Sequence, residues 1–469
     1  MSVLSASAQT DTIRYVKTTA NGGKYDNDGL SWTTAKSDLQ DAINDLHAYL
    51  TRNANVSSGS IYVAGATDGS VVYKPSESTD AGQTSVLYTS FKIYDGIHVY
   101  GGFKGDETLT DDDRTAKRTL PDKRVLTDGK ATGETTKMVY ENTPQNNILP
   151  WNFKYKTTLS GNQSNAGQPT VTWDSKKEQW TMKFPGSSYH VVWFATNGFI
   201  DDEKHPMRAD SLVVGASVDG FTIQDGNASI TDTYNRHHNS YGGGVYMVRR
   251  ARLERCVVTH CSATRGGGGV YMDGGGTMVN SRVTQCQSLG QGIIDGYGGG
   301  VCIGYDGTVE QSWIDHNVGR IGGGFAIYHS KSEYPESHLK VKAERNRPYA
   351  ASCIISNNTA TTEGGGVLMR GGTINHCTVV SNKCTGADIT YGTIRYGRTG
   401  GVKTRVALWE EGGHDTLHFK RSGCQGYCEM GPLVEIQPEG ILYTHVHPED
   451  CEEILEKTIL HGEIIDRLR

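Results

Sequence analysis

The sequence predicts an all-β fold in which short strands stack as the coils of a solenoid. Composition is the first observation: glycine accounts for 59 of 469 residues and apolar residues for only 36%, a balance that favours an elongated array. The second is a glycine triplet followed by Val or Phe, whose last glycine is Gly244, Gly269, Gly300, Gly324 and Gly366. The third is a six-residue block that begins at 256, 281, 312, 353 and 377. The shortest steps between blocks, 24 and 25 residues, are typical of one solenoid coil.

The blocks read CVVTHC, SRVTQC, SWIDHN, CIISNN and CTVVSN, so each begins with a small residue and ends in Cys or Asn. The closing residues are Cys261, Cys286, Asn317, Asn358 and Asn382. Stacked coils place equivalent positions about 4.8 Å apart, so the asparagines are expected to exchange amide hydrogen bonds from coil to coil, with thiols of similar size replacing them at two positions. The glycine triplets are expected to supply positive φ and close backbone approach where the coil enters its next strand.

This pattern resembles the right-handed parallel β-helix proteins of pectate-lyase-like architecture. Among them it is similar to the polymorphic outer-membrane-type repeats, which pair a glycine unit with an apolar residue three positions before an asparagine. The matching pairs are Ile314 with Asn317, Ile355 with Asn358, and Val379 with Asn382. The resemblance covers about residues 12–402 and implies a right-handed parallel β-helix.

The resemblance also divides the chain. Residues 12–215 are expected to form an N-terminal cap helix and irregular coils, and residues 216–402 the regular repeats. The segment 28–46 is similar to the family's entry segment and capping helix, 61–64 and 73–75 to a first coil, and 91–108 to the strand pair that follows. Residues 125–215 are expected to be decorated coils with surface loops, and 328–349, within the longest step between blocks, a loop that leaves the stack.

The chain begins with MSVLSASAQ, which resembles the small-residue end of a secretory signal without its charged start and most of its apolar core. We therefore interpret residues 1–11 as a signal-peptide remnant and expect a secreted or cell-surface protein, with a short disordered leader as the alternative. The net charge is −6 without a basic stripe, which argues against nucleic acid as a partner. No run of eighteen apolar residues occurs, so no transmembrane helix is expected.

The expected function is adhesion or glycan binding, with a carbohydrate or a host or cell-surface ligand as partner and no catalytic residue assigned. A polysaccharide lyase or glycoside hydrolase is the alternative, because pectate-lyase-like folds also host such enzymes. The best local candidates for acid–base chemistry are Asp315, His316 and Arg320, although sister coils fill the first two positions with TH, TQ and SN, which favours a structural role. The acidic runs DDDR (111–114) and DDEKH (201–205) lack the ligand spacing of a calcium site and are expected to be solvated loops.

Periodicity ends near Val402, and residues 403–469 are expected to form helix, strand, cysteine loop, two strands and helix. The stretch GCQGYCEMGPLV and the later PED and EEI resemble the thioredoxin-like [2Fe–2S] ferredoxin module of NADH-oxidising flavoprotein subunits in respiratory complex I and hydrogenases. The resemblance implies Cys424 and Cys428 as half of a set of four thiolate ligands. The family's other pair lies upstream, yet no cysteine occurs between Cys384 and Cys424, so a cluster is expected only if two further thiolates are supplied.

Alternatives stay open at this segment. Cys424 and Cys428 could form a disulfide or remain free thiols. His445 and His447 are expected to alternate on a strand, as surface residues or, with a carboxylate, as zinc ligands. A bound cluster would make the segment an incomplete electron-transfer module of an NADH dehydrogenase or hydrogenase, which belongs in the cytoplasm, whereas the β-helix is expected to be exported. The neighbourhood of Val402 is therefore predicted to join two unrelated coding segments, by gene fusion or by faulty sequence assembly.

Overall fold

The structure is a computed structural model of the chain. It describes residues 12–78, 83–127, 129–132, 149–164, 167–195, 215–230, 237–248, 250–290, 295–304, 307–327, 348–369, 372–375, 377–385, 394–396, 434–436, 441–447 and 450–468. Several predictions fall outside these ranges, namely those for residues 1–11, the acidic run 201–205, most of the loop 328–349, the junction at Val402, and both Cys424 and Cys428.

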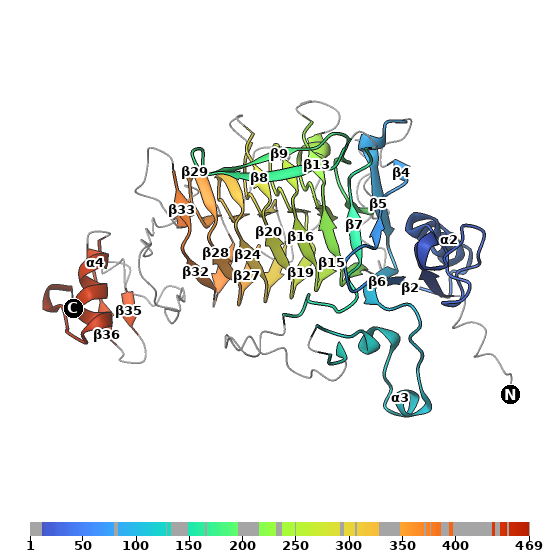
Figure 1. The fold of residues 1–469 in the computed structure, drawn as a ribbon. Helices are drawn as coiled ribbons and strands as arrows, with labels where there is room; N and C mark the ends of the chain where they lie inside the picture. Colours follow the sequence, from blue (N-terminus) through green and yellow to red (C-terminus); the bar gives the residue numbers. More distant parts are fainter. Residues whose placement is uncertain are drawn as a thin grey trace.

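Four sheets of stacked strands form the body of the molecule (Figure 1). The first sheet contains β1 (Ile13–Val16), β2 (Gly59–Ala64), β6 (Ile97–Phe103), β11 (Ala216–Asp219), β15 (Ala251–Glu254), β19 (Thr277–Val279), β23 (Thr308–Glu310), β27 (Tyr349–Ala351) and β31 (Thr373–Asn375). The second sheet contains β3 (Val72–Tyr73), β7 (Thr158–Ser160), β12 (Thr222–Gln224), β16 (Val257–Thr259), β20 (Arg282–Thr284), β24 (Trp313–Asp315), β28 (Ile354–Ser356) and β32 (Thr378–Val380).

The other two sheets complete each coil. The third sheet contains β13 (Asn227–Ala228), β17 (Ser262–Ala263), β21 (Gln287–Ser288), β25 (Val318–Ile321), β29 (Thr359–Glu363) and β33 (Lys383–Cys384). The fourth sheet contains β4 (Glu77–Ser78), β5 (Thr89–Tyr94), β10 (Val192–Ala195), β14 (Val245–Val248), β18 (Val270–Asp273), β22 (Val301–Ile303), β26 (Phe325–Ile327), β30 (Val367–Met369) and β34 (Ile394–Tyr396). Neighbouring strands in all four sheets are parallel except β4 and β5. The stack confirms the predicted all-β fold and its parallel β-helix.

From β15 onward, the described corners on either side of the second sheet are formed by a residue with a side chain in the left-handed conformation, which ordinarily costs free energy. Corner residues between the first and second sheets, with φ from 47° to 52°, are Arg255, Asn280, Gln311 and Ser352. Those between the second and third sheets, with φ from 52° to 55°, are His260, Gln285, His316, Asn357 and Ser381. The corners of successive coils stay in register because backbone hydrogen bonds join neighbouring coils there. For example, the backbone N–H of His316 donates to the Ser356 carbonyl at 3.3 Å.

The predicted asparagine column is confirmed inside the corner between the second and third sheets. The side-chain nitrogen Nδ2 of Asn317 donates to Oδ1 of Asn358 at 3.0 Å, and Nδ2 of Asn358 donates to Oδ1 of Asn382 at 2.9 Å. Nδ2 of Asn317 also donates to the backbone carbonyl of Val283 at 2.9 Å. All three asparagines are at most 1% exposed. Cys286 continues the column, since its backbone N–H donates to Oδ1 of Asn317 at 3.0 Å.

The glycine triplets also have the predicted backbone role. Gly267, the first residue of one triplet, has φ of 61°, which glycine adopts without steric cost. A Cβ on the next residue, Gly268, would lie 2.2 Å from the carbonyl oxygen of Gln287. The triplet therefore permits both the turn and the close approach of the next coil.

A helix covers the N-terminal end of the stack, as predicted. Helix α2 (Leu39–Arg52) begins after Asp38, whose side chain accepts a hydrogen bond from the Asp41 amide at 3.0 Å. Its apolar face buries Leu39, Ile43 and Leu46 in the main core. Figure 1 shows α2 beside β2 and β5, so the first coils do not present an uncovered apolar end.

The irregular region contains an ordered hairpin where surface loops were predicted. Strands β8 (Thr170–Asp174) and β9 (Gln179–Lys183) pair antiparallel and run across the strands of several coils in Figure 1. The short helices of the body are η1 (Thr19–Asn21), η2 (Val86–Tyr88), α3 (Asp111–Thr115), η3 (Leu120–Lys123) and η5 (His237–Ser240). Within the described ranges no helix has the length and apolar character needed to span a membrane.

Candidate functional site

Tryptophan and charged side chains gather where the β8–β9 hairpin meets the outer side of the second sheet. They come from segments that are far apart in the sequence. We call this set the tryptophan–arginine cluster, and its members are Trp173, Trp180, Arg282, Trp313, Asp315 and His316.

The hairpin contributes two of the tryptophans. Trp173 and Trp180 are direct cross-strand partners, and their rings make an edge-on contact with centroids 5.0 Å apart. Nε1 of Trp180 donates to the backbone oxygen of His316 at 2.8 Å, and Glu178 in the hairpin turn forms an ion pair with Lys383. The hairpin is thereby bound to two coils that lie much later in the chain, while Trp173 keeps 45% of its surface exposed.

The second sheet contributes the other members through strand alternation. Val283 and Ile314 point into the core and are fully buried, so their strand neighbours Arg282, Trp313 and Asp315 lie on the outer side. Arg282 forms a bidentate pair with Asp315, with Nε to Oδ1 at 2.8 Å and Nη2 to Oδ2 at 2.6 Å. The same guanidinium lies over the Trp313 ring, 4.7 Å from its centroid.

Asp315 orients the imidazole of His316. Nδ1 of His316 lies 2.7 Å from Oδ2 of Asp315, and the carboxylate is 0% exposed while the imidazole side chain is 51% exposed. Burial alone would raise the pKa of Asp315, but hydrogen bonds from Arg282 and His316 and the charge of Arg282 outweigh it and lower the pKa. The carboxylate is therefore ionised and fully engaged, and His316 is the member that can offer a polar edge to a ligand.

This geometry corrects one part of the predicted acid–base group. Asp315 and His316 do lie together, but Nε of Arg320 on β25 donates to the backbone oxygen of Asp295 at 3.1 Å. The arginine that pairs with Asp315 is Arg282, which lies one coil earlier because β20 and β24 pair in register. The bend positions predicted from sister coils are also found, since His316 occupies the same left-handed corner as His260 and Gln285.

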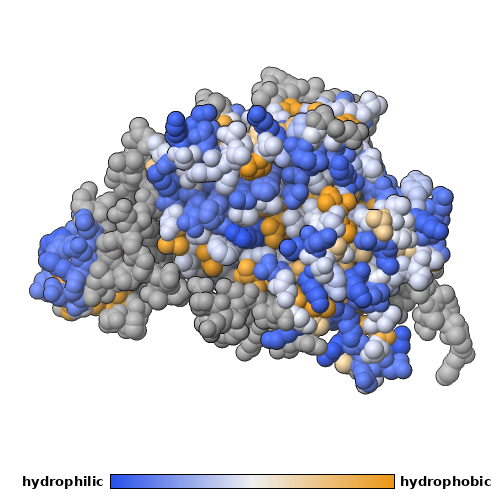
Figure 2. All heavy atoms as spheres, in the orientation of Figure 1, coloured by the Kyte–Doolittle hydropathy of each residue, from blue (hydrophilic) through white to orange (hydrophobic). Residues whose placement is uncertain are grey.

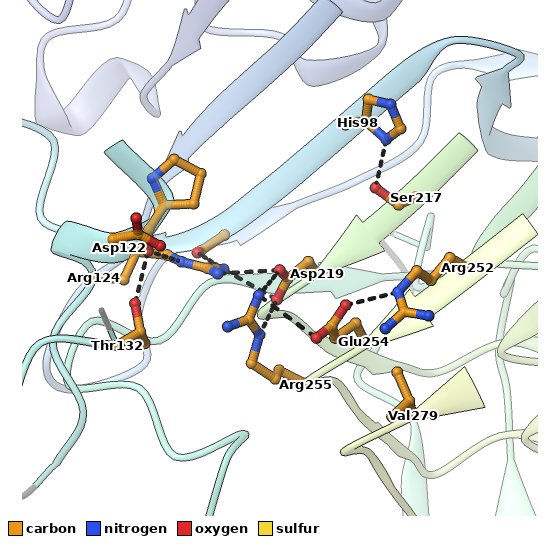
Figure 3. A network of polar contacts seen from close by, with 12 residues as sticks. His98, Asp122, Arg124, Thr132, Ser217, Asp219, Arg252, Glu254, Arg255 and Val279 are labelled. Carbon is orange, nitrogen blue, oxygen red and sulfur yellow. Dashed lines mark hydrogen bonds and ion pairs between the residues drawn. The ribbon is translucent and has the colours of Figure 1, made fainter. Parts of the chain in front are cut away.

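A second charged group lies on the outer side of the first sheet (Figure 3). Asp219, 2% exposed, accepts from Nη1 and Nη2 of Arg124 at 3.1 and 3.0 Å and from Nε of Arg255 at 2.9 Å. Arg124 is 0% exposed, donates to the Gly101 carbonyl at 3.2 Å, and lies 4.9 Å from the ring centroid of Phe153. The buried carboxylate is held by both guanidinium groups, so the network ties the segment that contains Arg124 to the β-helix.

Of the two acidic runs, only residues 111–114 lie within the described ranges. Residues 111–114 fall in α3, where Thr110 and Asp113 form a capping box. Thus DDDR is a helix start instead of the predicted solvated loop. Among described residues no group of three or more His, Cys, Asp and Glu side chains is arranged to hold a metal ion.

The described part of the C-terminal segment forms a small core of its own. Strands β35 (Val434–Ile436) and β36 (Ile441–Tyr443) pair antiparallel and precede α4 (Cys451–Glu453), the π-helical turn η8 (Ile454–Leu460) and η9 (Asp466–Leu468). This confirms the predicted succession of two strands and a helix. The buried core residues are Tyr443, Val446, Ile454, Ile465 and Leu468.

The predicted placement of the two histidines on a strand is wrong. Strand β36 ends at Tyr443, and His445 has φ of 54°, so the chain leaves the extended conformation before His447. The backbone N–H of His447 donates to the Asp450 carboxylate at 2.7 Å. The chain turns here, and the Asp450 carboxylate can therefore accept this bond. The turn ends the alternation of side chains that a strand would have. Both histidines are exposed, and Cys424 and Cys428 lie outside the described residues.

Comparison with known proteins finds similarity to ferredoxins over a short part of the chain. A 2Fe-2S ferredoxin of Clostridium pasteurianum is 46% identical over 48 residues, which are 10% of this chain and 47% of that protein. A 2Fe-2S ferredoxin of Aquifex aeolicus (strain VF5) is 47% identical over 47 residues, 10% of this chain and 42% of that protein. The chain thus spans less than half the length of these curated relatives, and the predicted ferredoxin similarity is confirmed at this partial extent. No protein-family model matches the chain, and no solved structure matches it.

The tryptophan–arginine cluster was missed by the sequence analysis. Alignment of the six-residue blocks does place Arg282 one coil before Trp313, which is a signal for their contact. The stretch TVTWDSKKEQWTMK also alternates on both sides of a polar turn, as a hairpin does. Nothing in that stretch indicates where on the β-helix the hairpin lies.

Proposed function

We propose that this protein is an exported, surface-associated β-helix that binds a glycan at the tryptophan–arginine cluster. The observation that carries the proposal is the continuous series of contacts from Trp173 through Trp180, His316, Asp315 and Arg282 to Trp313. Aromatic faces beside oriented polar groups suit a sugar ring, because the ring has apolar C–H faces and hydrogen-bonding hydroxyl groups at its edge.

Binding is favoured over cleavage at this cluster. Glycoside hydrolysis requires two carboxyl groups flanking the scissile bond, and the cluster contains one, Asp315, which is buried and held by Arg282. Figure 2 supports a polar ligand in this view, because the visible face is mostly hydrophilic with hydrophobic residues in small scattered groups. Such a face lacks the large apolar patch that typically marks a hydrophobic partner surface.

Trp173→Ala should weaken glycan binding about tenfold, the loss expected for one aromatic stacking contact of roughly 1.4 kcal/mol. Affinity electrophoresis of the full chain in gels containing neutral or acidic polysaccharides measures the effect. The matched control is Tyr25→Ala, since Tyr25 is an exposed aromatic residue, at 65%, outside the cluster. Equal retardation of both variants, or no retardation of the native protein by any polysaccharide, would contradict the proposal.

A second candidate function is electron transfer by a [2Fe–2S] cluster at the C-terminal segment, favoured by the identity to 2Fe-2S ferredoxins. The residues that would ligate iron are Cys424 and Cys428, which provide two of the four thiolates that such a cluster requires. The other two would have to come from elsewhere in this chain or from another chain. When bound, the cluster would supply one-electron chemistry.

Cluster binding predicts visible absorbance and stoichiometric iron in the full chain after anaerobic reconstitution with iron and sulfide. Cys424→Ser should abolish both signals. Glu452→Gln is the matched control because Glu452 lies in the same segment, in α4, and has no thiol that could supply one of the missing ligands. A colourless native protein, or equal loss in both variants, removes this candidate without affecting glycan binding.

A further inference from the structure

Two pairs of cysteines are stacked in adjacent coils of the β-helix. Cys353 and Cys377 each precede a strand of the second sheet, and the residues after them, Ile354 and Thr378, are register partners. Cys261 and Cys286 are stacked in the same way between the second and third sheets, directly before the register pair Ser262 and Gln287. Equivalent positions in parallel neighbours lie about 4.8 Å apart, within the Cα separation of roughly 4.4–6.8 Å that a disulfide spans.

The two pairs differ in the environment of their sulfur atoms. The backbone N–H of Cys353 donates to Sγ of Cys377 at 3.4 Å, a contact that stabilises a thiolate. Hydrogen bonding to the Cys353 side chain lowers the pKa of Cys377 in spite of burial, and the same interaction together with burial raises the pKa of Cys353. Burial, together with hydrogen bonding to the Cys286 side chain, raises the pKa of Cys261. The pair at 353 and 377 therefore combines a nucleophilic thiol with a neighbouring thiol that can complete an exchange reaction.

We propose that Cys353 and Cys377 are an oxidation site that forms a disulfide between neighbouring coils, in preference to Cys261 and Cys286. The oxidant is a small-molecule or protein disulfide. The Cys377 thiolate attacks one of its sulfur atoms, forming a mixed disulfide and releasing one thiolate. Cys353 then loses its proton and attacks Sγ of Cys377, which releases the second thiol. Two protein thiols are oxidised, and one external disulfide is reduced to two thiols.

The link would replace weak hydrogen bonds that the two thiols make to neighbouring carbonyl oxygens. The thiols of Cys353 and Cys377 donate to the carbonyls of Ala351 at 3.2 Å and Asn375 at 3.4 Å. Both weak bonds would be lost, but the Asn375 carbonyl also accepts from the Ser352 amide at 3.0 Å. The link would join two successive coils covalently, and it is independent of glycan binding.

Oxidation of the reduced full chain with oxidised glutathione tests the proposal. After alkylation and non-reducing digestion, mass spectrometry should find a peptide pair joined through Cys353 and Cys377, forming earlier than any pair joined through Cys261 and Cys286. Cys353→Ser should abolish the link and leave glutathione on Cys377; serine occupies this coil position at Ser281 and Ser312, both buried. Cys261→Asn is the control that should retain the link, because Asn317 occupies its position in a later coil.

Three results would overturn the proposal. In the first, Cys353 and Cys377 are still alkylated after other thiols have been oxidised. In the second, Cys261 and Cys286 become linked faster than Cys353 and Cys377. In the third, the native chain holds a stable glutathione adduct on Cys377 and forms no link to Cys353. The linked peptide of the native chain decides the question even if a variant fails to fold.

Discussion

Asp219→Asn should lower the free energy of unfolding by about 3–5 kcal/mol, the usual cost of breaking a buried ion pair by removing one partner. The substitution keeps the shape of the side chain and removes its charge, so Arg124 and Arg255 would remain in place without a carboxylate. Arg124 is 0% exposed, and water cannot replace the lost interaction there. Denaturant unfolding of both proteins, followed by circular dichroism, measures the difference.

The matched control is Asp45→Asn. Asp45 also pairs with an arginine, Arg14, at 2.5 Å, but its side chain is 44% exposed. An ion pair in that setting contributes about 0–1 kcal/mol, since solvent screens it. Equal destabilisation by the two substitutions would show that burial of the Arg124–Asp219–Arg255 network has no energetic consequence.

The same network predicts a pH dependence. Burial would raise the pKa of Asp219, but the charges and hydrogen bonds of Arg124 and Arg255 outweigh it and lower the pKa. Because the folded-state pKa lies below the unfolded-state value of about 3.9, this stabilisation is present above that value and is lost as pH falls through the folded-state pKa. The native protein should therefore lose more stability than Asp219→Asn on acidification through that range.

Features that repeat from coil to coil could be predicted from the sequence, because one local pattern recurs with a fixed structural meaning. The column of Asn317, Asn358 and Asn382 followed from the closing residue of each block, and the hydrogen bonds between these side chains confirm it. Helix α2 was expected from the resemblance of residues 28–46 to the family's entry segment and capping helix, although it begins at Leu39 and continues to Arg52.

Features set by one contact between distant segments were not predictable in this way. The position of the β8–β9 hairpin depends on the bond from Trp180 to His316, which joins residues 136 positions apart. Likewise, Arg282 is the register partner of Trp313 and reaches diagonally to Asp315 in the neighbouring coil. Proximity in the sequence suggested Arg320 instead. Strand β36 ends where Thr444 and His447 bond to Leu468 and Asp450, which lie later in the chain. Local alternation alone carries no information about such a bond.

Asn358→Leu should destabilise the protein by about 3–5 kcal/mol, through lost hydrogen bonds to buried groups and through overpacking. Oδ1 of Asn358 accepts from the backbone N–H of Asn317 at 2.9 Å, and Nδ2 donates to the Ile314 carbonyl at 2.9 Å. Leucine would leave the Asn317 N–H without this acceptor in a site that is 0% exposed. A Cβ on Gly324 would lie only 2.6 Å from Nδ2 of Asn358, which shows how little room a branched side chain has. Thermal and denaturant unfolding measure the loss.

The control for this prediction is already present in the chain, because the same column position is cysteine at Cys261 and Cys286. Asn358→Cys should cost less than half as much as Asn358→Leu, since a thiol is small and its sulfur can accept a weak hydrogen bond. This ordering separates two explanations of the column. If hydrogen bonding and fit both matter, leucine is worse than cysteine. If only apolar burial mattered, leucine would be tolerated better than cysteine. The hydrogen bonds between the asparagine side chains would then not be what stabilises the column.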